Sequence, residues 1–228
     1  MNDNTAVPAT ATGTKTVPTA AALAVTIGIA VGCWIVSVSQ MNRMNMGVAT
    51  RLGSVAFFAA LWIPMMAAMM LPGAVPAVLR QARTRARLLT VAAFVISYVA
   101  VWALVGVAVY ALYRPHGSVA AGALVIAAGV YELTPLKRSC RLRCQQGGRS
   151  GLQLGLWCVG SSSGLMVVLL ALGLMSLTWM AVITVIVLVQ KVLPARALMD
   201  LPLAAAIVGF GLLIIITPSS IPGLMPPM

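Results

Sequence analysis

Seven long apolar runs, separated by short polar segments, constrain what this chain of 228 residues can fold into. A run of about 20 apolar residues can cross the hydrocarbon core of a bilayer as a helix. Only 8% of the residues are charged and 61% are hydrophobic, with a mean hydropathy of +1.03, so the chain lacks the charged surface of a soluble domain. The sequence therefore predicts an integral membrane protein and excludes a water-soluble fold.

The predicted architecture is all-α, a bundle of seven transmembrane helices. Backbone groups that face lipid must be hydrogen-bonded within a helix or a closed barrel, and the alternating pattern of barrel strands is absent. We expect a transmembrane domain over residues 18–217, a disordered cytosolic tail over 1–17 and an extracytoplasmic tail rich in Pro and Met over 218–228. The helices are predicted over 18–39, 54–79, 88–112, 119–137, 153–175, 177–194 and 201–217.

Basic residues predict the orientation of this bundle. Twelve of the 15 Lys and Arg fall on the side of the N-terminus, and only Arg43, Arg51 and Arg114 fall on the other side. The positive-inside rule therefore places the N-terminus in the cytoplasm and the C-terminus outside. Because topology explains the net charge of +12, nucleic acid is not an expected partner. Cleavage of the first run as a signal peptide would leave six spans, an alternative that loop charge does not decide.

Four methionines lie on one side of the second predicted helix: Met65, Met66, Met69 and Met70. At 100° per residue they cover an arc of about 140°. Thioethers are soft ligands that suit Cu(I), but methionine also fills gaps in apolar packing, which explains each of these residues equally well. Met44, Met46, Met225 and Met228 lie in predicted outer segments, where they would gather Cu(I) or cluster by chance.

Three cysteines are predicted near the cytosolic face of the bundle. Cys140 and Cys144 lie in the basic loop after the fourth predicted helix and would share one face if that loop is helical, and Cys158 enters the membrane at the same level. The cytosol keeps thiols reduced, and neighbouring arginines favour the thiolate that binds metal. The sequence leaves two interpretations open, a Cu(I) site and three ordinary free thiols. Cys33 is expected to be a packing residue.

Glu132 is the acidic residue within a predicted span, where an unpaired charge is expensive. Lys191 is the expected partner, with proton coupling or metal contact as alternatives, and Asp200 is expected to pair locally with Arg196. No nucleotide-binding loop occurs, and Ser161, Ser162 and Ser163 have no His or Asp partner for nucleophilic catalysis. We therefore expect no catalytic residue and no enzymatic activity.

Several segments together carry a family resemblance. They are Trp62 through Pro72, Gly129 through Cys140, Cys144, Gly155, Cys158, Leu165, Met166, Gly173, Met175, Trp179, Met180 and Lys191. From about residue 54 to 217 the chain resembles the bacterial domain-of-unknown-function family 2182, described as predicted metal-binding integral membrane proteins and sometimes labelled copper chaperones. The resemblance implies metal ligation by Cys140, Cys144, Cys158 and the four methionines of the second helix.

The chain also departs from this family pattern. Ser161, Ser162 and Ser163 stand where such proteins usually have Cys-Cys-Trp, and Leu154 and Arg143 stand where histidines are expected. A Glu expected before Lys191 is Gln190. These departures indicate one of two states: a member of the family with a weakened metal site, or a member that keeps the family's helices without a metal site.

Two hypotheses for function follow. In the first, the chain is a multi-pass copper-handling protein of the bacterial plasma (inner) membrane, whose cargo Cu(I) is bound, transferred or chaperoned by Met and Cys side chains. In the second, it is a structural or assembly subunit of a membrane complex with a vestigial metal site. A copper membrane enzyme or another membrane subunit is the expected partner in the bilayer. A proton-coupled carrier that uses Glu132 is a third interpretation.

Overall fold

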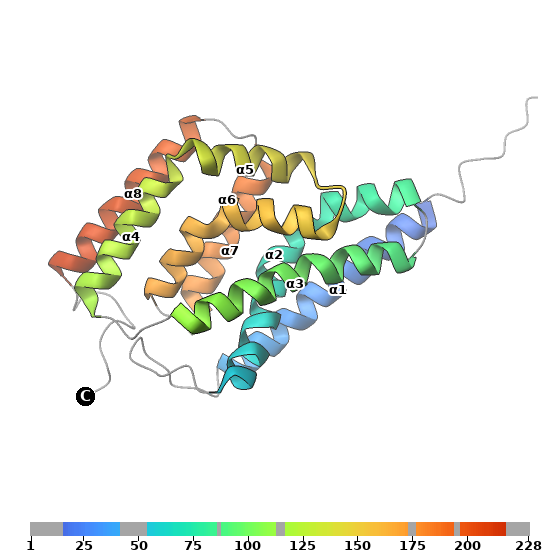
Figure 1. The fold of residues 1–228 in the computed structure, drawn as a ribbon, viewed down its shortest axis with the longest axis horizontal. Helices are drawn as coiled ribbons and strands as arrows, with labels where there is room; N and C mark the ends of the chain where they lie inside the picture. Colours follow the sequence, from blue (N-terminus) through green and yellow to red (C-terminus); the bar gives the residue numbers. More distant parts are fainter. Residues whose placement is uncertain are drawn as a thin grey trace, which may run out of the picture.

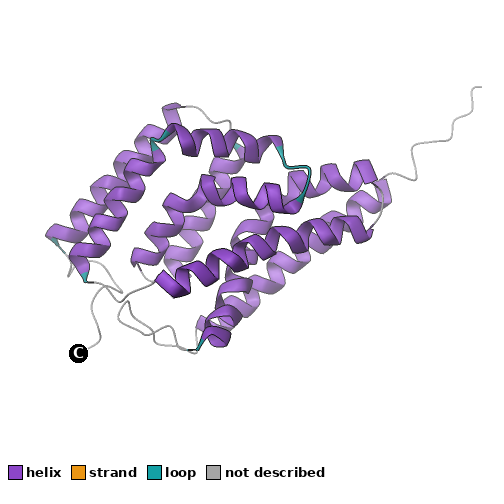
Figure 2. Cartoon of the chain, viewed as in Figure 1, coloured by secondary structure: helices purple, strands orange, loops and turns teal. Residues whose placement is uncertain are grey.

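The computed structural model describes residues 16–41, 54–85, 88–112, 117–172, 177–193 and 197–217. Within these residues the fold is made of helices joined by short connections, and no strand occurs (Figure 2). The all-α prediction is therefore confirmed. The helices are α1 (Thr16–Met41), α2 (Val55–Arg85), α3 (Leu88–Leu112), α4 (Ser118–Glu132), α5 (Pro135–Gln146), α6 (Gly151–Leu172), α7 (Leu177–Val192) and α8 (Ala197–Ile216).

The helices differ in whether they could cross a membrane. Among the described residues, four helical segments are long and apolar enough to cross a membrane: Thr19–Met41, Val55–Thr84, Leu89–Leu112 and Gly151–Leu172. The α4 and α5 pair makes a fifth candidate if it is counted as one bent span, whereas α7 and Asp200–Ile216 are shorter apolar helices. The structure thus gives four or five candidate spans where the sequence predicted seven.

The elongated bundle has two sides with a central pair of helices between them (Figure 1). Helices α1, α2 and α3 pack together on one side, and α4 packs along α8 on the other. Helix α6 contacts α3, α4, α5 and α7, so it joins the two sides, and α7 also contacts α2. Residues from α2, α5, α6 and α7 therefore meet near the middle of the molecule.

The predicted helix over 119–137 is wrong at its end, because the chain turns between Glu132 and Pro135. Helices α4 and α5 meet there at an angle of 65°. The Thr134 side chain caps α5 by accepting a hydrogen bond from the Lys137 backbone N–H, and Pro135 occupies the first turn, where its missing N–H costs nothing. Helix α5 then runs across one end of the bundle (Figure 1), where the sequence predicts only a loop.

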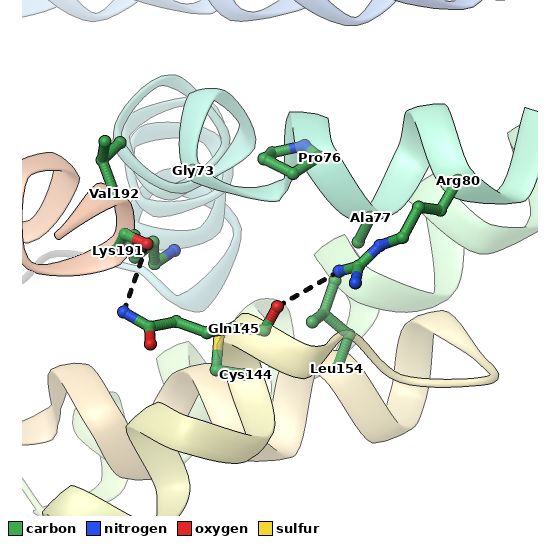
Figure 3. A pocket seen from close by; sticks show the side chains of 9 residues that line it. All are labelled: Gly73, Pro76, Ala77, Arg80, Cys144, Gln145, Leu154, Lys191 and Val192. Atoms are coloured by element: carbon green, nitrogen blue, oxygen red, sulfur yellow. Dashed lines mark hydrogen bonds between the residues drawn. The ribbon is translucent and has the colours of Figure 1, made fainter. Parts of the chain in front are cut away.

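Helix α2 also departs from its predicted bounds, since it continues to Arg85 instead of ending at residue 79. It contains Pro64, Pro72 and Pro76, and proline in a helix interior removes a backbone hydrogen bond and bends the helix. Figure 3 shows α2 changing direction between Gly73 and Pro76. This bend brings the second half of α2 over α5.

Candidate metal centre

The four methionines of α2 face the protein interior. The exposed fractions of Met65, Met66, Met69 and Met70 lie between 0% and 3%. All four lie in the apolar core. The Met70 sulfur also reaches a polar group, because the Lys191 ammonium donates a hydrogen bond to its Sδ over 3.6 Å. Met70 is thus the methionine that the structure joins to a charged side chain.

Two of the predicted cysteines come together beside Met70 and Lys191. The thiols of Cys144 on α5 and Cys158 on α6 lie close enough to interact with each other, and the Lys191 ammonium lies close enough to interact with Cys158. Cys158 is 0% exposed, and its Sγ lies 3.1 Å from the Tyr98 hydroxyl on α3. Helices α2, α3, α5, α6 and α7 therefore contribute to one cluster, the sulfur cluster, which consists of Met70, Tyr98, Cys144, Cys158 and Lys191.

Cys140 lies outside this cluster, although it is one helical turn before Cys144. Its buried sulfur faces α6 at Gly160, where an added Cβ would lie only 2.6 Å from the Cys140 Sγ. Among the described residues, no three His, Cys, Asp or Glu side chains form a group that could hold a metal ion. The structure therefore brings together two thiols and one thioether, and it does not gather the three thiols of the sequence prediction.

A cavity of about 340 Å³ opens beside the sulfur cluster (Figure 3). Cys144 and Lys191 are part of its wall, and Cys158 and Met70 contact these two residues from the buried side. Its full lining is Gly73, Pro76, Ala77, Arg80, Cys144, Gln145, Leu154, Lys191 and Val192. A small cargo that enters the cavity would meet the Cys144 thiol first.

Arg80 holds one wall of the cavity in place. Its guanidinium donates hydrogen bonds to the backbone carbonyls of Gln146 at 2.7 Å and Gln145 at 3.3 Å, carbonyls at the C-terminal end of α5 that lack helical partners (Figure 3). The next residue, Gly147, has a φ of +77°, and a Cβ there would overlap the Arg80 guanidinium. The bend in α2 and the end of α5 therefore fix each other.

The opposite wall is fixed by contacts between α5 and the end of α7. The Gln145 amide donates to the backbone carbonyls of Leu193 at 2.7 Å and Lys191 at 3.4 Å. Arg141 donates to the Gln190 carbonyl at 2.8 Å. These bonds position the Lys191 backbone so that its side chain reaches Met70 and Cys158.

Glu132 does not pair with Lys191, which corrects the expected ion pair. Its carboxylate forms a buried salt bridge with Lys137 and accepts a hydrogen bond of 3.0 Å from the Gln190 amide. The turn at Thr134 is the reason, because it folds α5 back so that Lys137 reaches a residue five positions earlier. Asp200 pairs with Arg141 at 2.5 Å, and its expected partner Arg196 lies outside the described residues.

These clusters lie within a stretch that matches a known family. The family model PpoB2, described as a copper chaperone, matches residues 59–214, which is more than half of the chain. This chain belongs to the PpoB2 family. No curated protein and no solved structure matches it. Membership in the PpoB2 family supports a copper-handling role, while the family number 2182 stays a prediction.

The donor set of the sulfur cluster fits the cargo that the PpoB2 description names. Thiolates and thioethers are soft ligands that select Cu(I) over hard cations, and Cys144, Cys158 and Met70 supply two thiols and one thioether. The outer methionines Met44, Met46, Met225 and Met228 lie outside the described residues.

Sequence reasoning did not place Tyr98 or Lys191 in the site. In the sequence, Lys191 stood out only as a residue of the family resemblance and as the expected partner of Glu132, and neither signal pointed to the sulfurs. Tyr98 carried no signal, because an aromatic residue in an apolar helix is typical of core packing. Ser161, for which the sequence offers no catalytic partner, is buried, and its hydroxyl lies close to the Cys144 thiol.

Proposed function

We propose that this chain binds Cu(I) in the sulfur cluster and passes it on, with Cys144, Cys158 and Met70 as the ligands. The convergence of two thiols and a thioether beside a cavity, in a chain of the copper-chaperone family, is the observation that carries the proposal. It narrows the ligand set expected from the sequence by leaving Cys140, Met65, Met66 and Met69 as packing residues.

The order of exposure suggests how the cargo moves. Cys144 is partly exposed on the cavity wall, so it binds Cu(I) first, and the fully buried Cys158 and Met70 complete the site. The thiols lose their protons as they bind the metal. Release reverses these steps by ligand exchange with a thiolate or thioether of the recipient, so the copper needs no change of oxidation state. A copper-requiring membrane enzyme is the recipient class that we propose.

The proposed location is the bacterial plasma membrane, with all seven predicted helices crossing and the N-terminus in the cytoplasm. Four or five helices with the required length and hydropathy support membrane insertion, and the charge asymmetry of the connecting segments supports the orientation. A C-terminal alkaline phosphatase fusion tests this topology. Activity in intact cells is expected, and an inactive fusion at normal expression would contradict the orientation.

Copper uptake by the full-length chain in detergent micelles tests the proposed ligands. We expect stoichiometric Cu(I) under anaerobic reducing conditions, and loss of nearly all of it in the double variant Cys144→Ser/Cys158→Ser. Cys33→Ser is the matched control, because it removes a thiol on α1 and should leave uptake unchanged.

Two outcomes of this experiment would reject the proposal. One is the absence of Cu(I) uptake by the unaltered chain, which would favour the structural or assembly role. The other is equal uptake by the unaltered chain and the Cys144→Ser/Cys158→Ser variant. A further loss in Cys140→Ser would show that the third thiol participates, and a ligand set limited to Cys144, Cys158 and Met70 would then be wrong.

A further inference from the structure

The Lys191 side chain is built into the sulfur cluster. Its ammonium donates a hydrogen bond to the Met70 Sδ over 3.6 Å and interacts electrostatically with the Cys158 thiol. Its stem crosses α2 at Gly73, where an added Cβ would lie 2.9 Å from the Lys191 Nζ and closer still to the stem. Gly73 therefore leaves the room that lets a lysine reach the two sulfurs.

No carboxylate of the described residues neutralises Lys191. Glu132 forms its salt bridge with Lys137, and Asp200 forms its salt bridge with Arg141. The remaining acidic residue of the chain, Asp3, lies outside the described residues. Within the described part of the chain, the ammonium interacts with the sulfurs of Met70 and Cys158, and sulfur supplies a negative charge only as a thiolate.

The total charge of the cluster then depends on the metal. Two thiolates carry two negative charges, the thioether carries none, and Lys191 carries one positive charge. A monovalent cation brings the sum to zero, whereas a divalent cation leaves one positive charge. The dithiolate of a monovalent metal carries one negative charge beside the fully buried Cys158 and Met70, where an uncompensated charge is costly, and the nearby Lys191 compensates it. The cluster with Lys191 is therefore balanced for a monovalent metal.

We propose that Lys191 is a specificity-determining residue, whose fixed positive charge makes the cluster of Cys144, Cys158 and Met70 prefer soft monovalent cations over soft divalent cations. This inference rests on the proposed function, and it explains why the cluster would bind one thiophilic metal ion in preference to another. Sulfur ligands alone bind Cu(I), Ag(I), Zn(II) and Cd(II), so donor softness does not separate these ions, and charge does.

Paired titrations of the full-length chain in detergent micelles with Cu(I) and Cd(II) test this inference. Cu(I) is titrated against a competing chromophoric chelator, and Cd(II) is followed by the ultraviolet absorption of its thiolate complex. We expect Lys191→Met and Lys191→Gln each to weaken Cu(I) binding about tenfold, because the anionic Cu(I) dithiolate loses its counter-charge, and to leave Cd(II) binding nearly unchanged, because the Cd(II) dithiolate is neutral. The preference for Cu(I) over Cd(II) then falls about tenfold in both neutral variants.

Arg149→Gln is the matched control, because it removes an exposed positive charge between α5 and α6 and should leave the preference unchanged. An unchanged preference in both Lys191 variants would overturn the inference, as would an equal change in Arg149→Gln. If the unaltered chain binds Cu(I) while the preference stays constant, only this inference fails. If the unaltered chain takes up no Cu(I), the proposed function fails and the inference fails with it.

Discussion

Two lysines lie inside the bundle, and their surroundings differ. Lys137 is 1% exposed, and its charge is balanced by the Glu132 carboxylate, which also accepts a hydrogen bond from Gln190. Lys191 is only partly buried, lies in the wall of a cavity and contacts the sulfurs of Met70 and Cys158. The first lysine has a permanent counter-charge, whereas the second has partners whose charge depends on protonation and metal binding.

This difference separates a structural ion pair from the proposed binding site. The Glu132–Lys137 pair joins the end of α4 to the start of α5, so it fixes the turn between them. It is closed off from the cavity that Cys144 and Lys191 line. The interpretation of Glu132 as a proton carrier was based on its burial without a partner. The carboxylate has a cationic partner, Lys137, and this ion pair explains its burial. Lys191 contacts the Met70 Sδ and lines the cavity, so it is the lysine to which we assign a role in the proposed metal binding.

Matched substitutions of the two lysines should give the largest difference in stability. Lys137→Met leaves the Glu132 carboxylate without its cation, and breaking a buried pair in this way costs about 3–5 kcal/mol. Lys191→Met removes no salt bridge of the described residues, and we expect a cost of about 1 kcal/mol or less, typical of a single hydrogen bond. Denaturant titration of both variants in mixed micelles measures the free energy of unfolding.

Simultaneous replacement of both partners sharpens this comparison. Glu132→Gln/Lys137→Met removes both charges, so it should recover most of the stability that Lys137→Met loses. Equal losses in Lys137→Met and Lys191→Met, or no recovery in the double variant, would mean that the two lysines do not differ in the way described.

A smaller effect should separate Met70 from Met66, its neighbour in the apolar core. Both side chains are 0% exposed, and replacing Met by Leu conserves their volume, so we expect similar and small effects on stability. Met70→Leu also removes a sulfur ligand, and Cu(I) affinity should fall about tenfold, which corresponds to about 1.4 kcal/mol. Met66→Leu should bind Cu(I) like the unaltered chain. Equal weakening in both variants would restore the broader methionine site that the sequence suggested.

Much of the fold follows from the sequence, because apolar runs of sufficient length dictate helices. The prediction over 88–112 coincides with α3, and α1, α6 and α7 lie within a few residues of their predicted bounds. The sequence prediction failed at Thr134-Pro135. An N-cap residue followed by proline marks a helix start, yet the prediction continued the preceding apolar run through it to residue 137.

That missed turn explains most of what the sequence could not predict about the site. In a continuous helix, residues five positions apart point in different directions, so Lys137 was not a candidate partner for Glu132. With Lys137 excluded, Lys191 was assigned to the carboxylate instead of to the sulfurs. The approach of Cys144 to Cys158 was predicted only as proximity to the same face of the membrane. Their direct contact depends on how α5 crosses α6, which no local pattern encodes.

Copper K-edge X-ray absorption of the Cu(I)-loaded full-length chain tests the central claim most directly. The account predicts a first shell of sulfur, made of two thiolates and one weaker thioether. The thioether contribution should disappear in Met70→Leu, and one of the two thiolate contributions should disappear in the single variant Cys144→Ser, which keeps the Cys158 thiolate. A first shell dominated by nitrogen or oxygen, or a sulfur shell that neither variant changes, would contradict it.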